Sequence, residues 1–152
     1  MKLTSPAFEE QGTIPPQYTC DGEGVRPELS WSDVPVGTQS FVLIMDDPDI
    51  PDFVKEKRGI DVFDHWLLYN IPREARTKGE GELVGVIGLN SAGTMQYIGP
   101  CPPDCEHRYI FVLRALDCTL ELSELPTKEN ILRAMNGHVL AEVRLVGKYK
   151  RI

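Results

Sequence analysis

The 152-residue sequence predicts a mainly β protein, most simply a packed sandwich or Greek-key arrangement with one or two short helices. Apolar runs of strand length recur between Gly, Pro and Asp residues. The 13 glycines and 12 prolines favour many turns over long helices. No linker, repeat or low-complexity tract divides the chain, so we expect a single domain over residues 1–152.

Two strands are predicted in the first half of the chain. Residues 40–45 are almost continuously apolar and stop at Asp46-Asp47-Pro48, as expected of a central strand that runs into a constrained turn. Residues 65–71 form a second apolar run, which ends before Pro72. Alternation gives this strand two faces, His65, Leu67, Tyr69 and Ile71 against Trp66, Leu68 and Asn70.

Two further strands are predicted in the second half. Residues 108–116 alternate between the faces of a sheet, and residues 138–149 alternate as a strand with one wet face does. For the first of these strands the two faces are Tyr109, Phe111, Leu113 and Ala115 against Arg108, Ile110, Val112 and Arg114.

Helical signals are few. Thr127 is a suitable N-cap, Glu129 complements the first turn and Gly137 fits the C′ position, which predicts one helix between them. Residues 121–125 are interpreted as a single short turn, and the charged residues 53–62 as an exposed loop.

The bulk composition narrows the class of partner. A net charge of −7 without a Lys/Arg stripe argues against nucleic acid, and it requires any anionic ligand to be held by a local arrangement. No run of 18 apolar residues predicts a transmembrane segment, and the first residues do not read as an export signal. A cytoplasmic protein is therefore expected.

Four cysteines are expected to be reduced thiols in that compartment, namely Cys20, Cys101, Cys105 and Cys118. A zinc site built from Cys101, Cys105 and His107 needs a fourth ligand from Cys20 or Cys118, and no second closely spaced pair supports it. No metal and no cofactor are therefore assigned. A local Cys101–Cys105 disulfide is geometrically feasible but disfavoured under reducing conditions.

Three short stretches combine polar groups with prolines at the edges of predicted strands: 46–51, 64–66 and 99–109. Alone, each is equally typical of a solvated Asp-Pro turn or of an imidazole bonded to a backbone carbonyl. Together they place four reactive groups at strand ends, where they can converge on one pocket mouth. These groups are the side chains of Asp47, His65, His107 and Tyr109.

The chemistry of this set favours anion binding. A carboxylate raises the pKa of a neighbouring imidazole, so we expect a cationic His65 or His107. With the Tyr109 hydroxyl and backbone N–H groups near Gly99, either ring forms a donor-rich cup for phosphate. Asp47 would orient a histidine or accept a bond from an amine on the ligand.

Catalytic signatures are weak. Neither a Gly-x-Ser-x-Gly elbow, nor a Gly-x-x-x-x-Gly-Lys loop, nor His-Glu-x-x-His occurs, and no catalytic residue is assigned. Two enzymatic hypotheses stay open. One is a hydrolase that uses the Asp/His set, and the other is an activated thiolate at Cys101 or Cys105.

Several motifs, in order, resemble the phosphatidylethanolamine-binding proteins, and specifically their bacterial and archaeal Raf-kinase-inhibitor-like branch. They are Tyr18-Thr-Cys-Asp-Gly22, Leu29-Ser-Trp31, Asp47-Pro48-Asp49-x-Pro51, His65 with its strand ending Asn70-Ile71-Pro72, Gly-Pro-Cys-Pro-Pro before His-Arg-Tyr, Ala115-Leu116-Asp117, and Ala134-Met-x-Gly-His-Val-Leu-Ala141. The similarity covers almost the whole chain.

The resemblance implies an antiparallel β-sandwich with a small anion-accepting pocket at one end. Its binding residues would be Asp47, His65, Gly99, Pro100, Pro102, Pro103, His107 and Tyr109. The family binds phosphate, phosphorylethanolamine and acetate-like anions. Some members modulate kinases or inhibit proteases, and prokaryotic members often form homodimers.

A regulatory binding protein is thus the expected function. A serine protease inhibitor that acts through a surface loop is the alternative, and a phosphoester hydrolase is a third. Three departures from the family pattern bear on the ligand: Glu106 just before His107, Arg114 in place of an aromatic residue, and a longer 53–62 segment that could cover the pocket mouth.

Overall fold

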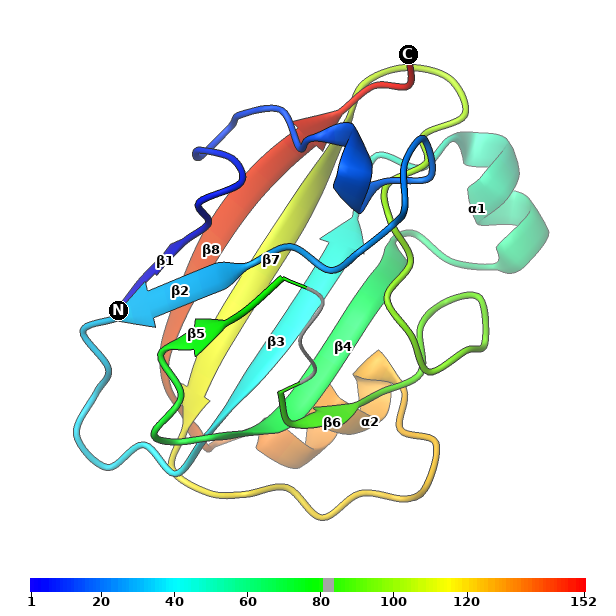
Figure 1. Cartoon of the computed structure of the whole chain (residues 1–152). Coiled ribbons are helices and arrows are strands. Elements are labelled where there is room, and N and C mark those ends of the chain that lie inside the picture. Colours follow the sequence, from blue (N-terminus) through cyan, green and yellow to red (C-terminus); the bar gives the residue numbers. More distant parts are fainter. Residues whose placement is uncertain (81–83) are drawn as a thin grey trace.

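The computed structural model describes residues 1–80 and 84–152, in which two antiparallel sheets lie face to face (Figure 1). The small sheet has the strand order β1 (Lys2–Thr4), β2 (Leu29–Ser32) and β5 (Thr77–Lys78). The large sheet has the order β6 (Val86–Ile87), β4 (Phe63–Pro72), β3 (Ser40–Asp47), β7 (His107–Leu116) and β8 (Val139–Tyr149). The predicted mainly β sandwich is confirmed.

Two helices and one helical turn complete the described chain: η1 (Pro16–Tyr18), α1 (Asp52–Arg58) and α2 (Lys128–Met135). The α2 helix is the predicted one. Thr127 caps it by accepting from the Asn130 backbone N–H, and the Asn130 side chain accepts the Thr127 N–H in return. Gly137 follows with a φ of 82°, as a residue just beyond a helix end often does.

The helical content differs from the sequence prediction in two segments. Residues 53–62 are not a loop throughout, because α1 occupies 52–58 between Pro51 and the left-handed Gly59. This helix buries none of its residues, so it has no apolar stripe for the sequence to display. Residues 121–125 are not a helical turn, and Pro126 disfavours helical backbone in the residue before it.

Two apolar clusters hold the layers together. One fills the space between the sheets and includes Trp31, Phe41 and Phe111. The other lies between the large sheet and α2, which Figure 1 shows behind it, and includes Ile44, Leu67 and Ile131. The predicted faces of β7 are confirmed, because Tyr109, Phe111, Leu113 and Ala115 all join the first cluster and Val112 joins the second.

The predicted alternation of β4 is wrong at its end because of a bulge. Phe41 pairs with Ile71 and Leu43 with Leu68, so β4 carries one residue more than β3 over this stretch. Asn70 takes the left-handed φ of 50°. Ile71 therefore packs between the sheets with Trp66 and Leu68, whereas Leu67 and Tyr69 face α2.

An ion network joins three elements on the α2 side. The Lys128 Nζ atom lies 2.9 Å from Asp46 Oδ2 and 3.1 Å from Asp64 Oδ1. Burial lowers the pKa of Lys128, but the two carboxylates more than offset this and hold its pKa above the ordinary value. The charge on Lys128 thus fixes α2 against the ends of β3 and β4.

The thiol prediction is wrong for two of the four cysteines. Cys20 and Cys101 form a disulfide, with 5.4 Å between their Cα atoms, whereas Cys105 and Cys118 are free. The partners are 81 residues apart, so spacing could not pair them, and the fold alone brings them together. Because disulfides are uncommon in reducing compartments, this bond gives no support to the cytoplasmic expectation, which stays a prediction.

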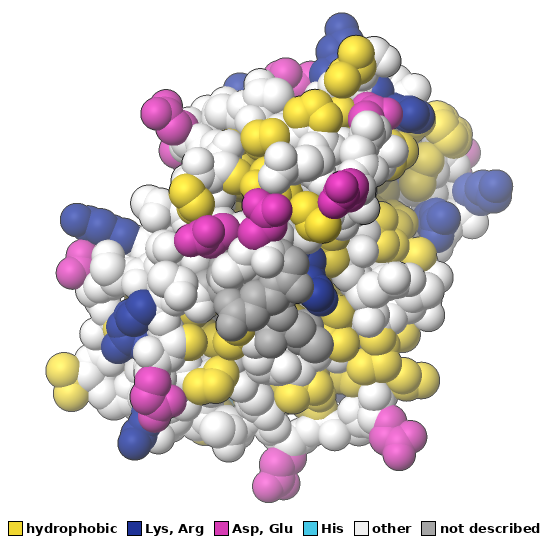
Figure 2. Space-filling view, viewed as in Figure 1, with side chains coloured by type: hydrophobic (Ala, Val, Ile, Leu, Met, Phe, Trp, Pro, Cys, Tyr) yellow, Lys and Arg dark blue, Asp and Glu magenta, His cyan; other side chains and the backbone are white. Residues whose placement is uncertain are grey.

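No helix in residues 1–80 and 84–152 is long and apolar enough to cross a lipid bilayer. The face shown in Figure 2 carries Lys and Arg side chains interspersed with Asp and Glu. An anion approaching this face meets charges of both signs rather than a uniform attractive field.

The Asn70 side chain pins the loop after β7 to β4, which gives a test of the bulge. Its Nδ2 donates to the Leu120 carbonyl and its Oδ1 accepts the Leu120 N–H, both at 2.8 Å. Asn70→Ala should lower the free energy of unfolding by about 2–3 kcal/mol, because both bonds and the tolerance of positive φ are lost.

Urea denaturation of Asn70→Ala and Asn70→Gly separates the two contributions. Glycine accepts the positive φ but makes neither bond, so its cost should be smaller by about 1 kcal/mol. A neutral Asn70→Gly variant would show that the Leu120 bonds do not contribute to stability.

Candidate functional site

A hollow of about 230 Å³ lies at the end of the sandwich where β3 finishes and β7 begins. Six of the eight predicted binding residues line it: Asp47, His65, Gly99, Pro103, His107 and Tyr109. The remaining two, Pro100 and Pro102, are buried within the adjoining loop and do not line the hollow. The structure therefore gathers these side chains from distant segments of the chain.

A larger hollow of about 510 Å³ lies elsewhere, between the N-terminal residues and β8. Its walls carry no histidine and no cysteine, and its polar groups include Glu9, Glu10 and Arg144. The titratable groups singled out by the sequence are concentrated in the smaller hollow, which is accordingly the candidate site.

A second bulge turns His65 into the hollow. Met45 pairs with Trp66 and Asp46 with Asp64, so His65 is the extra residue of β4 at this position. A bulge redirects the side chain of its strand. The His65 ring consequently packs edge-on against Tyr109, at 5.3 Å between ring centroids, on the face opposite the ion network of Asp64.

Asp47 is fixed by the turn that follows β3. Its Oδ1 accepts the Asp49 backbone N–H at 2.7 Å, as in an Asx turn, and its Oδ2 lies 2.7 Å from His107 Nδ1. Asp49 then binds the Arg108 guanidinium through both carboxylate oxygens, at 2.7 and 2.8 Å. The two acids of this turn thus anchor two consecutive residues at the start of β7.

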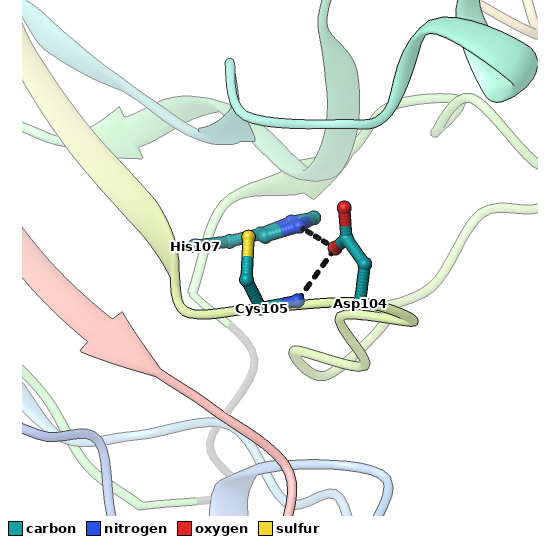
Figure 3. Close-up of side chains that lie close together, drawn as sticks. All are labelled: Asp104, Cys105 and His107. Atoms are coloured by element: carbon teal, nitrogen blue, oxygen red, sulfur yellow. Dashed lines mark hydrogen bonds and ion pairs between the residues drawn. The ribbon is translucent and has the colours of Figure 1, made fainter.

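His107 lies between two carboxylates, of which the sequence reasoning anticipated only one. Its Nδ1 meets Asp47, and its Nε2 lies 2.7 Å from Asp104 Oδ1 (Figure 3). Both ring nitrogens face acceptors, so both carry protons and the ring is an imidazolium. The sequence contained the signal for Asp104, because it precedes His107 by three residues in the same loop.

The charges of this triad explain its pKa values. Burial lowers the pKa of His107, but the bonds and charges of Asp47 and Asp104 outweigh burial and raise it above the ordinary value. Burial raises the pKa of the Asp47 carboxyl, against the lowering effect of its hydrogen bonds. The bond from His107 lowers the pKa of the exposed Asp104.

Of the two histidines expected as candidates for the cation, His65 is not the charged one. Burial lowers the pKa of His65 to about 4, so the ring is neutral near pH 7. The Nδ1 atom lies 2.7 Å from the Ile98 carbonyl oxygen and therefore carries the proton. The Nε2 atom is left as a hydrogen-bond acceptor, so the two histidines of the site differ in charge and in function.

The Tyr109 hydroxyl is buried and makes no hydrogen bond of ordinary geometry within residues 1–80 and 84–152. Burial raises the pKa of this phenol far above its usual value, although the neighbouring Cys101 backbone amide lowers it in part. The hydroxyl therefore keeps its proton and offers a free donor at the wall of the hollow. A buried hydroxyl that donates no hydrogen bond costs stability.

The α1 helix contributes a cation and apolar walls that the sequence reasoning missed. Val54 and Arg58, one turn apart, line the hollow together with Phe63. The Arg58 guanidinium carbon lies 5.4 Å from the centre of the Phe63 ring. The segment therefore does border the pocket, and it does so as a helix.

The Cys20–Cys101 bond holds the loop that closes the other side. Cys101 lines the hollow, and the Cys20 backbone N–H donates to the Pro100 carbonyl at 3.1 Å. A Cβ at Gly99 would come within 2.7 Å of the Tyr18 carbonyl oxygen, so this close approach requires glycine. The N-terminal segment is thereby tied directly to the wall of the site.

The three sequence departures have different outcomes. Glu106 is exposed and does not line the hollow. Arg114 pairs across the strands with Glu142, with 2.8 Å between Nε and Oε2, so it serves the sheet rather than the site. Only the 53–62 segment affects the pocket.

The family follows from comparison with known proteins. The family model named phosphatidylethanolamine-binding protein matches residues 4–150, so the chain belongs to that family. A UPF0098 protein of Chlamydia trachomatis is 45% identical over 152 residues, with 99% of both chains covered. A UPF0098 protein of Methanothermobacter thermautotrophicus is 45% identical over 158 residues, again with 99% of both covered.

Solved structures agree with this assignment. A phosphatidylethanolamine-binding protein homolog from Chlamydia trachomatis matches with a TM-score of 0.94 and 44% identity, covering 99% of this chain and 97% of the other. YbcL of E. coli matches with a TM-score of 0.86 and 25% identity, covering 99% and 98%. The predicted resemblance is confirmed.

The low pKa of His65 predicts a pH-dependent loss of stability. Its folded-state pKa lies below the ordinary value of 6.5, so the unfolded chain binds this proton more tightly and acid favours unfolding. Between pH 7 and pH 4.5, His65 should lower the free energy of unfolding by about 2 kcal/mol.

His65→Asn serves as the reference because an amide can keep an N–H near the position of Nδ1 without titrating. Chemical denaturation is measured at both pH values. From pH 7 to pH 4.5, the free energy of unfolding should fall by about 2 kcal/mol more in the wild type than in the variant. A difference independent of pH would mean that the pKa of His65 is the same in the folded and the unfolded protein.

Proposed function

We propose that the hollow binds the oxyanion of a small head group, such as phosphate or phosphorylethanolamine, and that the protein acts by binding. The observation that carries this proposal is the free, buried Tyr109 hydroxyl beside the imidazolium of His107. Both are donors within one hollow, and oxyanions are held by converging donors of this kind. A volume of about 230 Å³ suits a small head group rather than a drug-sized molecule.

The anion would take the place of Asp104 at His107. The Asp104 carboxylate already occupies Nε2, and its side chain is 44% exposed at the protein surface. Releasing an exposed carboxylate to water costs little, because it regains its hydration. The buried Asp47 would stay bonded to Nδ1 and keep the ring oriented.

An amine on the ligand would meet acceptors in the same hollow. His65 offers an unprotonated Nε2, and a displaced Asp104 offers its carboxylate. The exposed Arg58 supplies a positive charge at the rim for the phosphoryl end. This mixture of donors and acceptors favours a zwitterionic phosphoryl-amine over inorganic phosphate.

The arrangement supports binding more than turnover. Both nitrogens of His107 are engaged by carboxylates, so the ring lacks a free base for proton abstraction. The one cysteine that lines the hollow, Cys101, is bonded to Cys20 and cannot act as a thiolate. A regulatory role through a kinase or protease partner, and a homodimer, stay predictions from the family resemblance.

Removing the Tyr109 hydroxyl tests whether this group contributes to anion binding. Tyr109→Phe should weaken the binding of phosphorylethanolamine about tenfold, because one donor is lost. Tyr69→Phe makes the same change on the α2 side of the large sheet and should leave affinity unaltered. Calorimetric titration of the three proteins provides the measurement.

Equal affinities for wild type and Tyr109→Phe would contradict the proposed site. A panel of phosphoesters tested in parallel should show no turnover, and hydrolysis abolished by the same substitution would favour the hydrolase. Inhibition of a serine protease that survives both tyrosine substitutions would favour the loop inhibitor.

If the anion displaces Asp104 from His107, a variant without the Asp104 charge should bind phosphate more tightly, not less. Asp104→Asn removes the competing negative charge, so inorganic phosphate should bind several-fold more tightly than to wild type. The same change leaves the amine a neutral amide oxygen in place of a carboxylate, which is a weaker acceptor, so the preference for phosphorylethanolamine over phosphate should narrow. Unchanged phosphate affinity, measured by calorimetry at fixed pH and salt, would show that Asp104 does not compete for His107.

A further inference from the structure

Three potential metal ligands come together beside the hollow, on the loop that leads into β7. The nitrogen, sulfur and oxygen ligand atoms of His107, Cys105 and Asp104 all lie within 4.8 Å of one another. Figure 3 shows the Asp104 and Cys105 side chains pointing from the loop to the side on which His107 lies. Imidazole, thiolate and carboxylate form a set of ligands that zinc accepts in tetrahedral sites.

His107 is oriented as zinc-binding histidines are. Its side chain is 1% exposed, and its Nδ1 is bonded at 2.7 Å to the buried Asp47. A histidine that binds a metal through one nitrogen usually donates the other N–H to a carboxylate or carbonyl, which fixes the ring and raises its basicity. Here that second group is in place, and Nε2 points to the exposed side of the loop at Asp104.

We propose that Asp104, Cys105 and His107 form a zinc-binding site with an open fourth position. Its ligands lie in one four-residue stretch and need no other guest, although zinc and an oxyanion would compete for the same Nε2 atom of His107. It also differs from the zinc hypothesis raised by the sequence. In that hypothesis Cys101 was a ligand, but its sulfur is bonded to Cys20. Asp104 takes its place as the third ligand.

The distances require only a small adjustment of the loop. The Nε2 and Oδ1 atoms now share a proton at 2.7 Å, whereas zinc bonds of about 2.0–2.2 Å at a tetrahedral angle need roughly 3.3 Å between them. Asp104 and Cys105 are exposed, so their side chains can move without disturbing the core. The buried His107 needs no movement.

The exchange balances in charge and in atoms. In the metal-free form, the imidazolium, the neutral thiol and the carboxylate sum to zero. Zinc(II) replaces two protons, one from His107 Nε2 and one from the Cys105 thiol, and these protons pass to the buffer. The complex of zinc with neutral imidazole, thiolate and carboxylate again sums to zero, and Asp47 carries the same charge in both forms, so the exchange leaves the net charge of the site unchanged.

A second cluster provides an internal control. Asp117, Cys118 and His138 bring together the same three residue types within the same distance. His138 is 46% exposed, and its Nδ1 is held by Asp117 itself, so no further buried carboxylate orients the ring. The first cluster is thus the better prepared of the two.

Cobalt(II) reports on both clusters, because thiolate coordination gives a charge-transfer band in the near ultraviolet. The full-length protein, stripped of metal by a chelator, should develop this band on cobalt addition and lose it on zinc addition. Cys105→Ser should abolish the band and weaken zinc binding about tenfold or more, as measured by calorimetry. Asp104→Asn should weaken zinc binding while keeping the band.

The exposed Cys105 makes Cys105→Ser a mild change to the fold, and Cys118→Ser is the matched control. Cys118→Ser should keep the band and the affinity. A band that persists in Cys105→Ser, a band lost in Cys118→Ser, or no cobalt and zinc binding by wild type would each overturn the proposal. Phosphate is left out of every titration, so failure of the oxyanion proposal cannot alter the result.

Discussion

The buried hydrogen bond between Asp47 and His107 is the constraint on which the site depends. It joins the end of β3 to the start of β7, two neighbouring strands of the large sheet, and it is almost fully shielded from water. A buried carboxylate and a buried imidazolium are each costly alone, and each is tolerated because the other is present. The partnership fixes the ring and leaves its Nε2 as the variable position of the site. Asp104 occupies Nε2 in the structure, and the two proposals place an oxyanion or zinc at the same atom.

Because successive side chains of a strand point to opposite faces, neighbouring residues make contacts on opposite sides of the large sheet. Asp46 and Asp47 are adjacent, yet Asp46 holds Lys128 on the α2 side while Asp47 holds His107 in the hollow. Asp64 and His65 also lie on opposite sides of the sheet. Asp64 pairs with Lys128 on the α2 side, and a bulge turns His65 into the hollow. One side of the large sheet therefore carries a structural ion network and the other carries the site.

The Cys20–Cys101 bond and α1 enclose the hollow from two sides. The disulfide ties the N-terminal segment to the Gly99 loop, and α1 places Val54 and Arg58 across the opening. The disulfide and α1 lie outside the sheets. The strands therefore carry the titratable side chains of the hollow, and the connecting segments form its boundary. This division places the candidate side chains of Asp47, His65 and His107 on strands rather than on loops. It also places the free Cys105 outside the hollow but next to His107, where a metal could reach it.

The sequence by itself determined the fold class, the four long strands, the α2 helix and the family, because these follow from alternation, capping residues and ordered motifs. It also indicated which side chains would gather, since Asp47, His65, His107 and Tyr109 stand at strand ends. Tertiary structure alone decided the rest. The charge of His65 depends on its burial, the partner of Cys20 lies 81 residues away, and α1 has no buried stripe to announce it. The bulges at His65 and Asn70 arise from pairing with β3, and pairing is a property of two strands that neither one displays alone.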